Sequence, residues 1–216
     1  MSYPLDRTRE LEMVRRMVGF NARLGTICLI SGFRPWELHK MIGAGCLQSG
    51  RRPSTSDWYY GANLAKRVEA SLFAAHYWRN RRNEFTIEES LIDGYERYRN
   101  CVGDEPLVSF DRAFHLACLL EGDVYGVGER FFRMAVCPHC KCLHLVHVYT
   151  ERAPGKCVFC HLLARFPFDS RLQVRFPARS LPSGAEYRVP LPNDDSWRSS
   201  TTVSYTHLTL PTNREV

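Results

Sequence analysis

The sequence contains no long apolar run. No stretch approaches the roughly 20 consecutive apolar residues that a bilayer-spanning helix needs. Positions 1–12 carry charges and no apolar core, so they do not match the pattern of a secretory leader. These two absences predict a chain without a membrane segment that resides in the cytoplasm, where thiols stay reduced.

The short motifs of common zinc enzymes are also missing. There is neither the His-Glu-x-x-His helix of metalloproteases nor the His-x-Glu signature of nucleobase deaminases, and no internal repeat is visible. Acidic residues are fewer than basic ones, 23 against 29, for a net charge of +6. Arginine dominates the basic residues, and its planar fork suits phosphates and guanine edges. The charge is compatible with a nucleic-acid partner, although many soluble proteins reach this value.

What remains is an ordinary globular composition over 216 residues, 44% hydrophobic and 24% charged, which suits one compact domain, or one domain plus a small satellite. Apolar spacing predicts helices throughout the first 120 or so residues. One of these is expected from Trp58 to about Arg79 with a cap at Ser56 or Asp57, and the next should open with a Thr86-x-x-Glu89 capping box. A short strand is expected within 142–149. From Arg165 onward, prolines and arginines predict a poorly ordered basic tail.

The predicted fold class is mainly α, with a helix-turn-helix-like unit in a helical N-terminal body and a small C-terminal zinc-knuckle module with short strands. The expected divisions are a helical region at 1–45, a linker at 46–57, a helical body at 58–130, the zinc module at 131–170 and the tail at 171–216. Positions 203–216 match nothing before them and resemble translated sequencing-adapter read-through. We interpret them as non-native; a natural tail is the alternative.

Two Cys-x-x-Cys pairs, separated by sixteen residues, carry the strongest chemical signal: Cys137, Cys140, Cys157 and Cys160. Zinc takes four thiolates in a tetrahedron at about 2.3 Å, and each pair places two thiolates on one side of the ion. We predict one structural zinc ion per chain. Redox-active pairs would need a βαβ context, and disulfides are disfavoured in a reducing compartment. Four thiolates leave no open position for substrate, which argues against a zinc hydrolase.

Other nearby zinc-ligand types are not expected to join the site. Cys142 has the wrong spacing to pair with Cys140. The neighbouring imidazoles are expected at the surface or around the site rather than as ligands: His139, His144, His147 and His161.

The segment from Ile27 to Met41 has helix-turn-helix spacing, with Gly32 at the turn. Leu38 and Met41 are expected on the buried side of the second helix. The candidate DNA contacts on or beside its exposed side are Arg34, Trp36, His39 and Lys40. A structural hairpin or a subunit contact is the alternative. Further candidate phosphate contacts are Arg51, Arg52, Arg165 and Arg171, which otherwise are solvated surface charges.

Three features together resemble the FlhC family of flagellar transcriptional activators. They are the run Ser54-Thr55-Ser56-Asp57-Trp58-Tyr59 with Asn63 and 70–73 (ASLF), the spacing of the double cysteine pair, and the order of the segments. The family pattern reads Ser-Thr-Asp-Trp-Phe, so here Ser56 is inserted and Tyr59 replaces phenylalanine. The resemblance covers about residues 6–170.

The resemblance implies a non-enzymatic activator subunit whose four cysteines ligate zinc. It implies a partner subunit, FlhD, in a hexamer of four FlhD and two FlhC chains that binds promoters and activates flagellar operons. RNA polymerase is a further candidate partner. The alternative is a zinc-stabilised module that binds protein or RNA and no promoter; promoter binding would differ from it by a steep salt dependence and a sequence preference.

Overall fold

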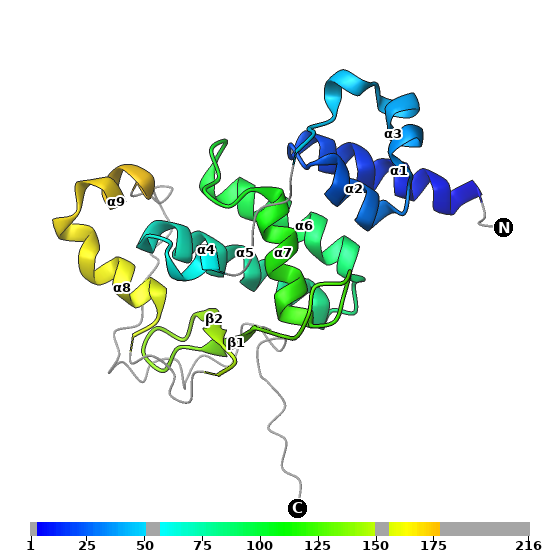
Figure 1. Ribbon diagram of the computed structural model, residues 1–216. Helices are drawn as coiled ribbons and strands as arrows, with labels where there is room; N and C mark the ends of the chain where they lie inside the picture. The colour runs from blue at the N-terminus through cyan, green and yellow to red at the C-terminus, as the bar shows by residue number, and fades with distance from the viewer. Residues whose placement is uncertain (1–3, 51–56, 150–155, 178–216) are drawn as a thin grey trace, which may run out of the picture. The chain divides into compact units, whose positions relative to one another are not determined.

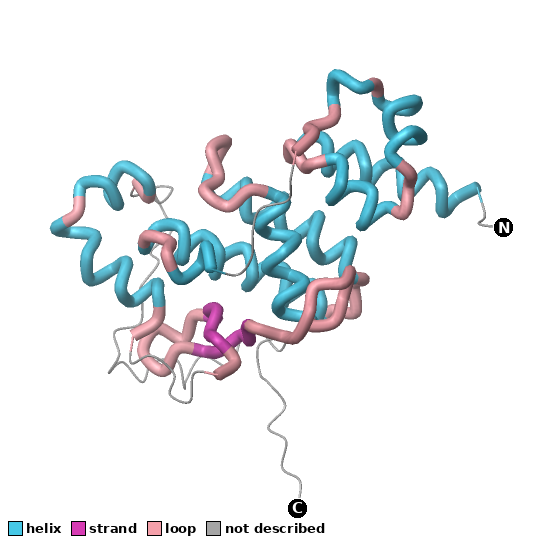
Figure 2. Tube along the Cα trace, in the orientation of Figure 1, coloured by secondary structure: helices cyan, strands magenta, loops and turns pink. Residues whose placement is uncertain are grey.

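The computed structural model describes residues 4–50, 57–149 and 156–177, all within the compact unit Met1–Pro177. Helices dominate this unit, and one two-stranded sheet lies near its C-terminal part (Figures 1 and 2). This confirms the predicted fold class. Within the described ranges, no helix has the length and apolar character needed to cross a bilayer. Arg51, Arg52 and the suspected non-native segment 203–216 fall outside the described residues.

The first three helices are α1 (Pro4–Gly19), α2 (Leu24–Ser31) and α3 (Pro35–Ile42), followed by a 3-10 turn, η1 (Ala44–Cys46). Gly32 ends α2 in the left-handed region at φ 72°, and its N–H donates to the Cys28 carbonyl at 2.9 Å. A side chain is strained in that conformation, which explains a glycine at the turn. Pro35 then takes the first position of α3, as a helix start favours. The helix-turn-helix-like unit is therefore confirmed.

Each of the two helices contributes a completely buried side chain to the main apolar core, Ile27 from α2 and Leu38 from α3. Met41 was expected beside Leu38 on the buried side, but 40% of it is exposed. That expectation was wrong: Leu38 is the buried residue of this short helix, and Met41 lies in its last turn, next to the end of the helix at Gly43.

The predicted helix from Trp58 to Arg79 is broken in two. It consists of a short α4 (Asp57–Tyr60) and a long α5 (Leu64–Arg82). Asn63 caps α5 by accepting a hydrogen bond from the Lys66 N–H at 2.9 Å. Glycine at 61 has low helix propensity and asparagine is a strong N-cap, so the chain restarts there. The cap expected at Ser56 or Asp57 is therefore wrong for α5.

Two further helices complete the helical body, α6 (Ile87–Val102) and α7 (Phe110–Glu121). The Thr86–Glu89 capping box is confirmed. The Thr86 N–H donates to the Glu89 carboxylate at 3.0 Å, and the Glu89 N–H donates to the Thr86 hydroxyl at 3.2 Å. Ser109 caps α7 through the Arg112 N–H at 3.4 Å.

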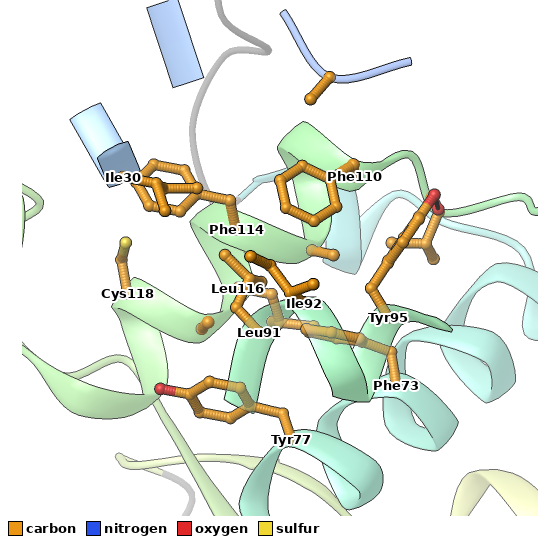
Figure 3. Close-up of a cluster of buried hydrophobic side chains, with 14 of the residues drawn as sticks. Ile30, Phe73, Tyr77, Leu91, Ile92, Tyr95, Phe110, Phe114, Leu116 and Cys118 are labelled. Carbon is orange, nitrogen blue, oxygen red and sulfur yellow. Dashed lines mark hydrogen bonds between the residues drawn. The ribbon is translucent and has the colours of Figure 1, made fainter. Parts of the chain in front are cut away.

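An aromatic core joins these helices (Figure 3). The Tyr95 ring lies 5.1 Å edge-on from both Phe110 of α7 and Phe20, which follows α1. Edge-to-face contacts of this kind add to the burial energy of the rings. Gly94 lets α6 approach α5 closely, since a Cβ there would lie 3.0 Å from the Tyr77 backbone nitrogen.

The buried carboxylate of Asp111, 5% exposed, ties the helix-turn-helix-like unit to the body. It accepts hydrogen bonds from the Thr26 hydroxyl at 2.5 Å and from the Arg23 N–H at 3.2 Å, at the start of α2. Arg16 of α1 pairs with Asp93 of α6 at 2.6 Å. The N-terminal helices are therefore attached to the body by polar contacts as well as by apolar packing.

The C-terminal part begins with an antiparallel hairpin, β1 (Phe132–Val136) and β2 (Leu143–His147), in which Phe132 pairs with His147 and Met134 with Leu145. It continues with α8 (Val158–Arg165), the 3-10 turn η2 (Phe166–Phe168) and α9 (Ser170–Arg175). Leu172 of α9 is buried in an apolar cluster with Leu64, Ala65 and Val68 of α5. Poor order was predicted from Arg165, and up to residue 177 this is wrong. Packing against a distant helix, invisible in local periodicity, orders the segment.

Candidate metal centre

The four predicted ligand residues lie together. The thiol sulfur atoms of Cys137, Cys140, Cys157 and Cys160 all fall within 4.8 Å of one another. The first pair follows β1, and the second pair begins α8. The cluster therefore joins the hairpin to a helix packed on α5, and it can hold a metal ion.

The distances fit a shared ion rather than disulfides. The Sγ atoms of Cys137 and Cys160 are 3.8 Å apart, and those of Cys140 and Cys157 are 3.4 Å apart. A disulfide requires about 2.0 Å. Four thiolates at about 2.3 Å from a tetrahedral ion lie about 3.8 Å from each other. The cross-pair spacing therefore matches the edges of a metal tetrahedron.

Local backbone geometry presents each pair. After Cys137 the chain makes a tight turn, in which the Lys141 N–H donates to the Cys137 carbonyl and the Cys137 N–H donates to the Cys142 carbonyl, both at 3.0 Å. Lys141 completes this turn at φ 59°, a region that few non-glycine residues occupy. In the second pair, Cys157 is the N-cap of α8, and its sulfur accepts from the Cys160 N–H at 3.4 Å.

The electrostatics of the cluster are compatible with a bound cation. Burial raises the pKa of the Cys137 thiol, but backbone hydrogen bonds from residues 139, 140 and 157 outweigh it and lower the pKa to about 5. For Cys160, burial and hydrogen bonding to the other three cysteines raise the pKa to about 12. Adjacent thiolates repel one another, so one ionises easily and another resists. A divalent ion, if bound by the four cysteines, would remove that conflict and keep all four deprotonated.

Other potential ligands remain outside the cluster. Cys142 is exposed and its sulfur is not part of the group, while His139 and His161 are exposed beside it. His144 is only 2% exposed, with its Nδ1 3.5 Å from the Cys142 carbonyl. His147 contacts the Phe131 ring edge-on at 4.6 Å. A closed four-sulfur set is therefore the arrangement the described residues offer.

The sequence patterns did not identify the contacts by which α4 and α5 support the β1–β2 hairpin that leads into the metal centre. The Ser71 hydroxyl accepts from the Leu145 N–H at 3.4 Å, and Tyr59 of α4 meets Phe132 edge-on at 5.1 Å. Ser71 lies inside the 70–73 run that carries the family resemblance, which was the available signal. Its role depends on a contact 74 positions away, and no local pattern reveals such a contact.

The predicted DNA contacts are distributed over two regions. Arg34, Trp36, His39 and Lys40 are all exposed on or beside α3, and Trp36 is 60% exposed. Arg165 of α8 and Arg171 of α9 are exposed as well, and Arg165 pairs with Asp169 at 2.9 Å. Figure 1 shows α3 and α9 far apart within Met1–Pro177. The structure therefore places four of the candidates on or beside α3 and two, Arg165 and Arg171, on α8 and α9.

Comparisons with known proteins point to one family. No curated protein sequence matches the chain. A family model described as "Flagellar transcriptional activator (FlhC)" matches residues 5–171. The match covers well over half of the chain, runs from α1 into α9 and includes all four clustered cysteines. This family consists of transcription activators and not of enzymes. The chain therefore belongs to the FlhC family of flagellar transcriptional activators.

Proposed function

We propose that this chain is a DNA-binding subunit of a cytoplasmic transcription activator, that it holds one structural zinc ion, and that it acts with FlhD at flagellar promoters. The family match over residues 5–171 carries this proposal. The expected assembly contains four FlhD and two FlhC chains. RNA polymerase is the further partner that an activator must influence.

Zinc is the metal that best suits the four-sulfur cluster. Thiolate ligands select soft or borderline ions, and a closed tetrahedral four-cysteine shell is the usual structural zinc site. Cys137 and Cys157 are buried, whereas Cys140 and Cys160 are partly accessible. The ion would join the β1–β2 hairpin to α8 and stabilise a module whose own apolar core is small.

The exposed face of α3 is the favoured DNA surface. It carries the positive charge of Lys40 and the imidazole of His39 beside the exposed indole of Trp36, and the positive charge of Arg34 directly precedes the helix. In a helix-turn-helix the second helix enters the major groove with its N-terminal residues at the base edges. Arg34 is exposed and forms no ion pair within the described ranges, so its guanidinium is available for a phosphate.

A protein partner accounts for a second set of exposed side chains. Leu163, Phe168 and Val174, on α8, η2 and α9, are 68%, 90% and 83% exposed. Exposed apolar side chains gathered on adjacent elements are typical of a protein interface. This observation also favours the alternative, a zinc-stabilised interaction module without promoter binding.

A mobility-shift experiment separates these two functions. The full chain is mixed with a flagellar promoter fragment or a scrambled fragment of equal length, with and without FlhD, over a range of salt, and zinc is assayed in the same sample. We expect tighter binding of the promoter fragment, a steep fall of affinity with salt and a requirement for FlhD. Equal, salt-insensitive binding of both fragments would reject promoter recognition, and metal-free protein would reject the zinc site.

A further inference from the structure

The exposed side of α3 carries one large aromatic side chain among basic ones. Trp36 is 60% exposed, although most of the indole surface is apolar. It directly follows Pro35 and lies in the first turn of α3, the second helix of the helix-turn-helix-like unit. Tryptophan is enriched among the residues that dominate binding interfaces. The position of Trp36 therefore suggests contact with a bound partner rather than with the protein core.

The helical period places Trp36 opposite the buried side of α3. Successive residues of a helix are rotated by about 100°, so residues two positions before and two positions after a given residue both lie roughly opposite to it. Leu38 is completely buried, and Trp36 and Lys40 occupy these two positions. Lys40 is exposed like Trp36. The two side chains therefore share the outermost ridge of α3, with Trp36 nearer to the start of the helix.

The charges around Trp36 fit a polyanion. Arg34 and Lys40 are exposed, and neither forms an ion pair within the part of the chain that the structure describes. Glu37, the acidic residue of α3, is half-buried, and its carboxylate accepts a hydrogen bond from the Arg34 N–H at 2.8 Å. This contact holds the acid against the backbone at the start of the helix. DNA phosphates would supply the counter-charge that Arg34 and Lys40 lack.

The chemistry of indole distinguishes between the base edges in the major groove. Indole combines an apolar ring with a single N–H donor and has no acceptor. Thymine presents a C5-methyl group beside the O4 acceptor, so one thymine can satisfy both parts of the side chain. Guanine offers acceptors without an apolar group, and adenine and cytosine each present an amino donor. Thymine is therefore the base that best matches Trp36.

We infer that Trp36 reads a thymine through its C5-methyl group in the major groove, while Arg34 and Lys40 contact phosphates. The inference rests on the proposed promoter binding and adds a base-specific contact to it. In a helix-turn-helix the first residues of the second helix approach the base edges. Trp36 meets this requirement, because it lies both in the first turn of α3 and on its outermost ridge.

The test compares a flagellar promoter fragment with the same fragment in which deoxyuridine replaces every thymine, a change that removes only the C5-methyl groups. Mobility shifts with the full chain and FlhD at fixed salt give the ratio of the two affinities. For the wild type we expect the deoxyuridine fragment to bind about three- to tenfold more weakly, as loss of a buried methyl contact predicts. Trp36→Ala should reduce this ratio by at least about threefold. Trp36→Gln, which keeps an N–H donor and loses the apolar ring, should do the same.

Two further variants of the same helix are the controls. Lys40→Ala should lower the affinity for both fragments and make its salt dependence shallower, but it should preserve the ratio between them. Met41→Ala removes another exposed apolar side chain, 40% exposed and nearer to the buried side of α3. It should also preserve the ratio. Circular dichroism of each variant verifies that the helices are retained.

Three results would overturn the inference. The first is a wild-type ratio near one. The second is an unchanged ratio in both Trp36 variants; equal losses on the two fragments would then assign Trp36 to a sugar–phosphate contact or to FlhD. In both cases, preference of the wild type for the promoter over a scrambled fragment would still support the proposed function. The third result is absence of that preference, which would reject the proposed function and the thymine contact together.

Discussion

Arg175 of α9 pairs with Glu69 of α5 across 106 positions of the chain, with Arg175 Nε 2.6 Å from Glu69 Oε1. The Glu69 side chain is completely buried. Its second carboxylate oxygen accepts from the Leu107 N–H at 2.9 Å and from the Tyr98 hydroxyl. Burial, strengthened by this contact with Glu69, raises the pKa of Tyr98, so the phenol stays a donor. One buried acid therefore connects α9, α6 and the chain before α7.

Replacing Arg175 by methionine should destabilise the protein by about 1–3 kcal/mol, because the Glu69 carboxylate would lose its counter-charge while staying buried. Arg165→Met is the matched control. Arg165 is 60% exposed in its pair with Asp169, and an exposed i,i+4 pair contributes about 0.5 kcal/mol or less. Urea unfolding followed by circular dichroism measures both. Equal losses in the two variants would contradict a special role for the buried pair.

Cys157→Ser should release zinc and unfold the hairpin and α8 while the N-terminal helices persist. The oxygen of serine is a poor substitute for a zinc thiolate, and a structural site with three thiolates binds far more weakly. Metal analysis and far-ultraviolet circular dichroism provide the measurements. Cys142→Ser serves as the control, because Cys142 is exposed and outside the cluster. Stoichiometric zinc in the Cys157 variant would refute its assignment as a ligand.

Gly94→Ala and Gly25→Ala should change stability in opposite directions. Alanine is the better helix former, so Gly25→Ala, with open space around its Cβ position, should stabilise by about 0.5–1 kcal/mol. At Gly94 the added methyl would lie 3.0 Å from the Tyr77 backbone nitrogen and would force α5 and α6 apart. Overpacking of this kind costs about 1–3 kcal/mol. Thermal unfolding of the two variants gives the comparison, and stabilisation at Gly94 would contradict the close helix contact.

Combining Arg34→Ala with Lys40→Ala should weaken promoter binding by the complex with FlhD and reduce the salt dependence of the affinity. The slope of log K against log salt becomes shallower by about 0.9 for each DNA phosphate that the protein no longer neutralises. Arg97→Ala, which removes an exposed charge from α6, is expected to leave specific binding nearly unchanged. Titrations at several salt concentrations provide both slopes. An unchanged slope in the double variant would transfer the DNA surface to the region of Arg165 and Arg171.

Local sequence patterns were sufficient to predict features whose determining residues lie close together in the chain. The Thr86–Glu89 capping box, the glycine turn at position 32 and the two Cys-x-x-Cys turns each depend on residues at most four positions apart. Each of them took its expected local form. The helix break before α5 was missed although its determinant, Asn63, is also local. Apolar spacing runs smoothly across that position and outweighed the cap signal in the prediction.

Contacts between distant segments required the folded chain. The order of residues 165–177 depends on Leu172 and Arg175 meeting α5. Spacing along the chain could predict that the four thiols would lie together, because the chemistry of each pair is contained in four residues. It could not pair Glu69 with Arg175, because burial and electrostatic pairing arise only when helices pack.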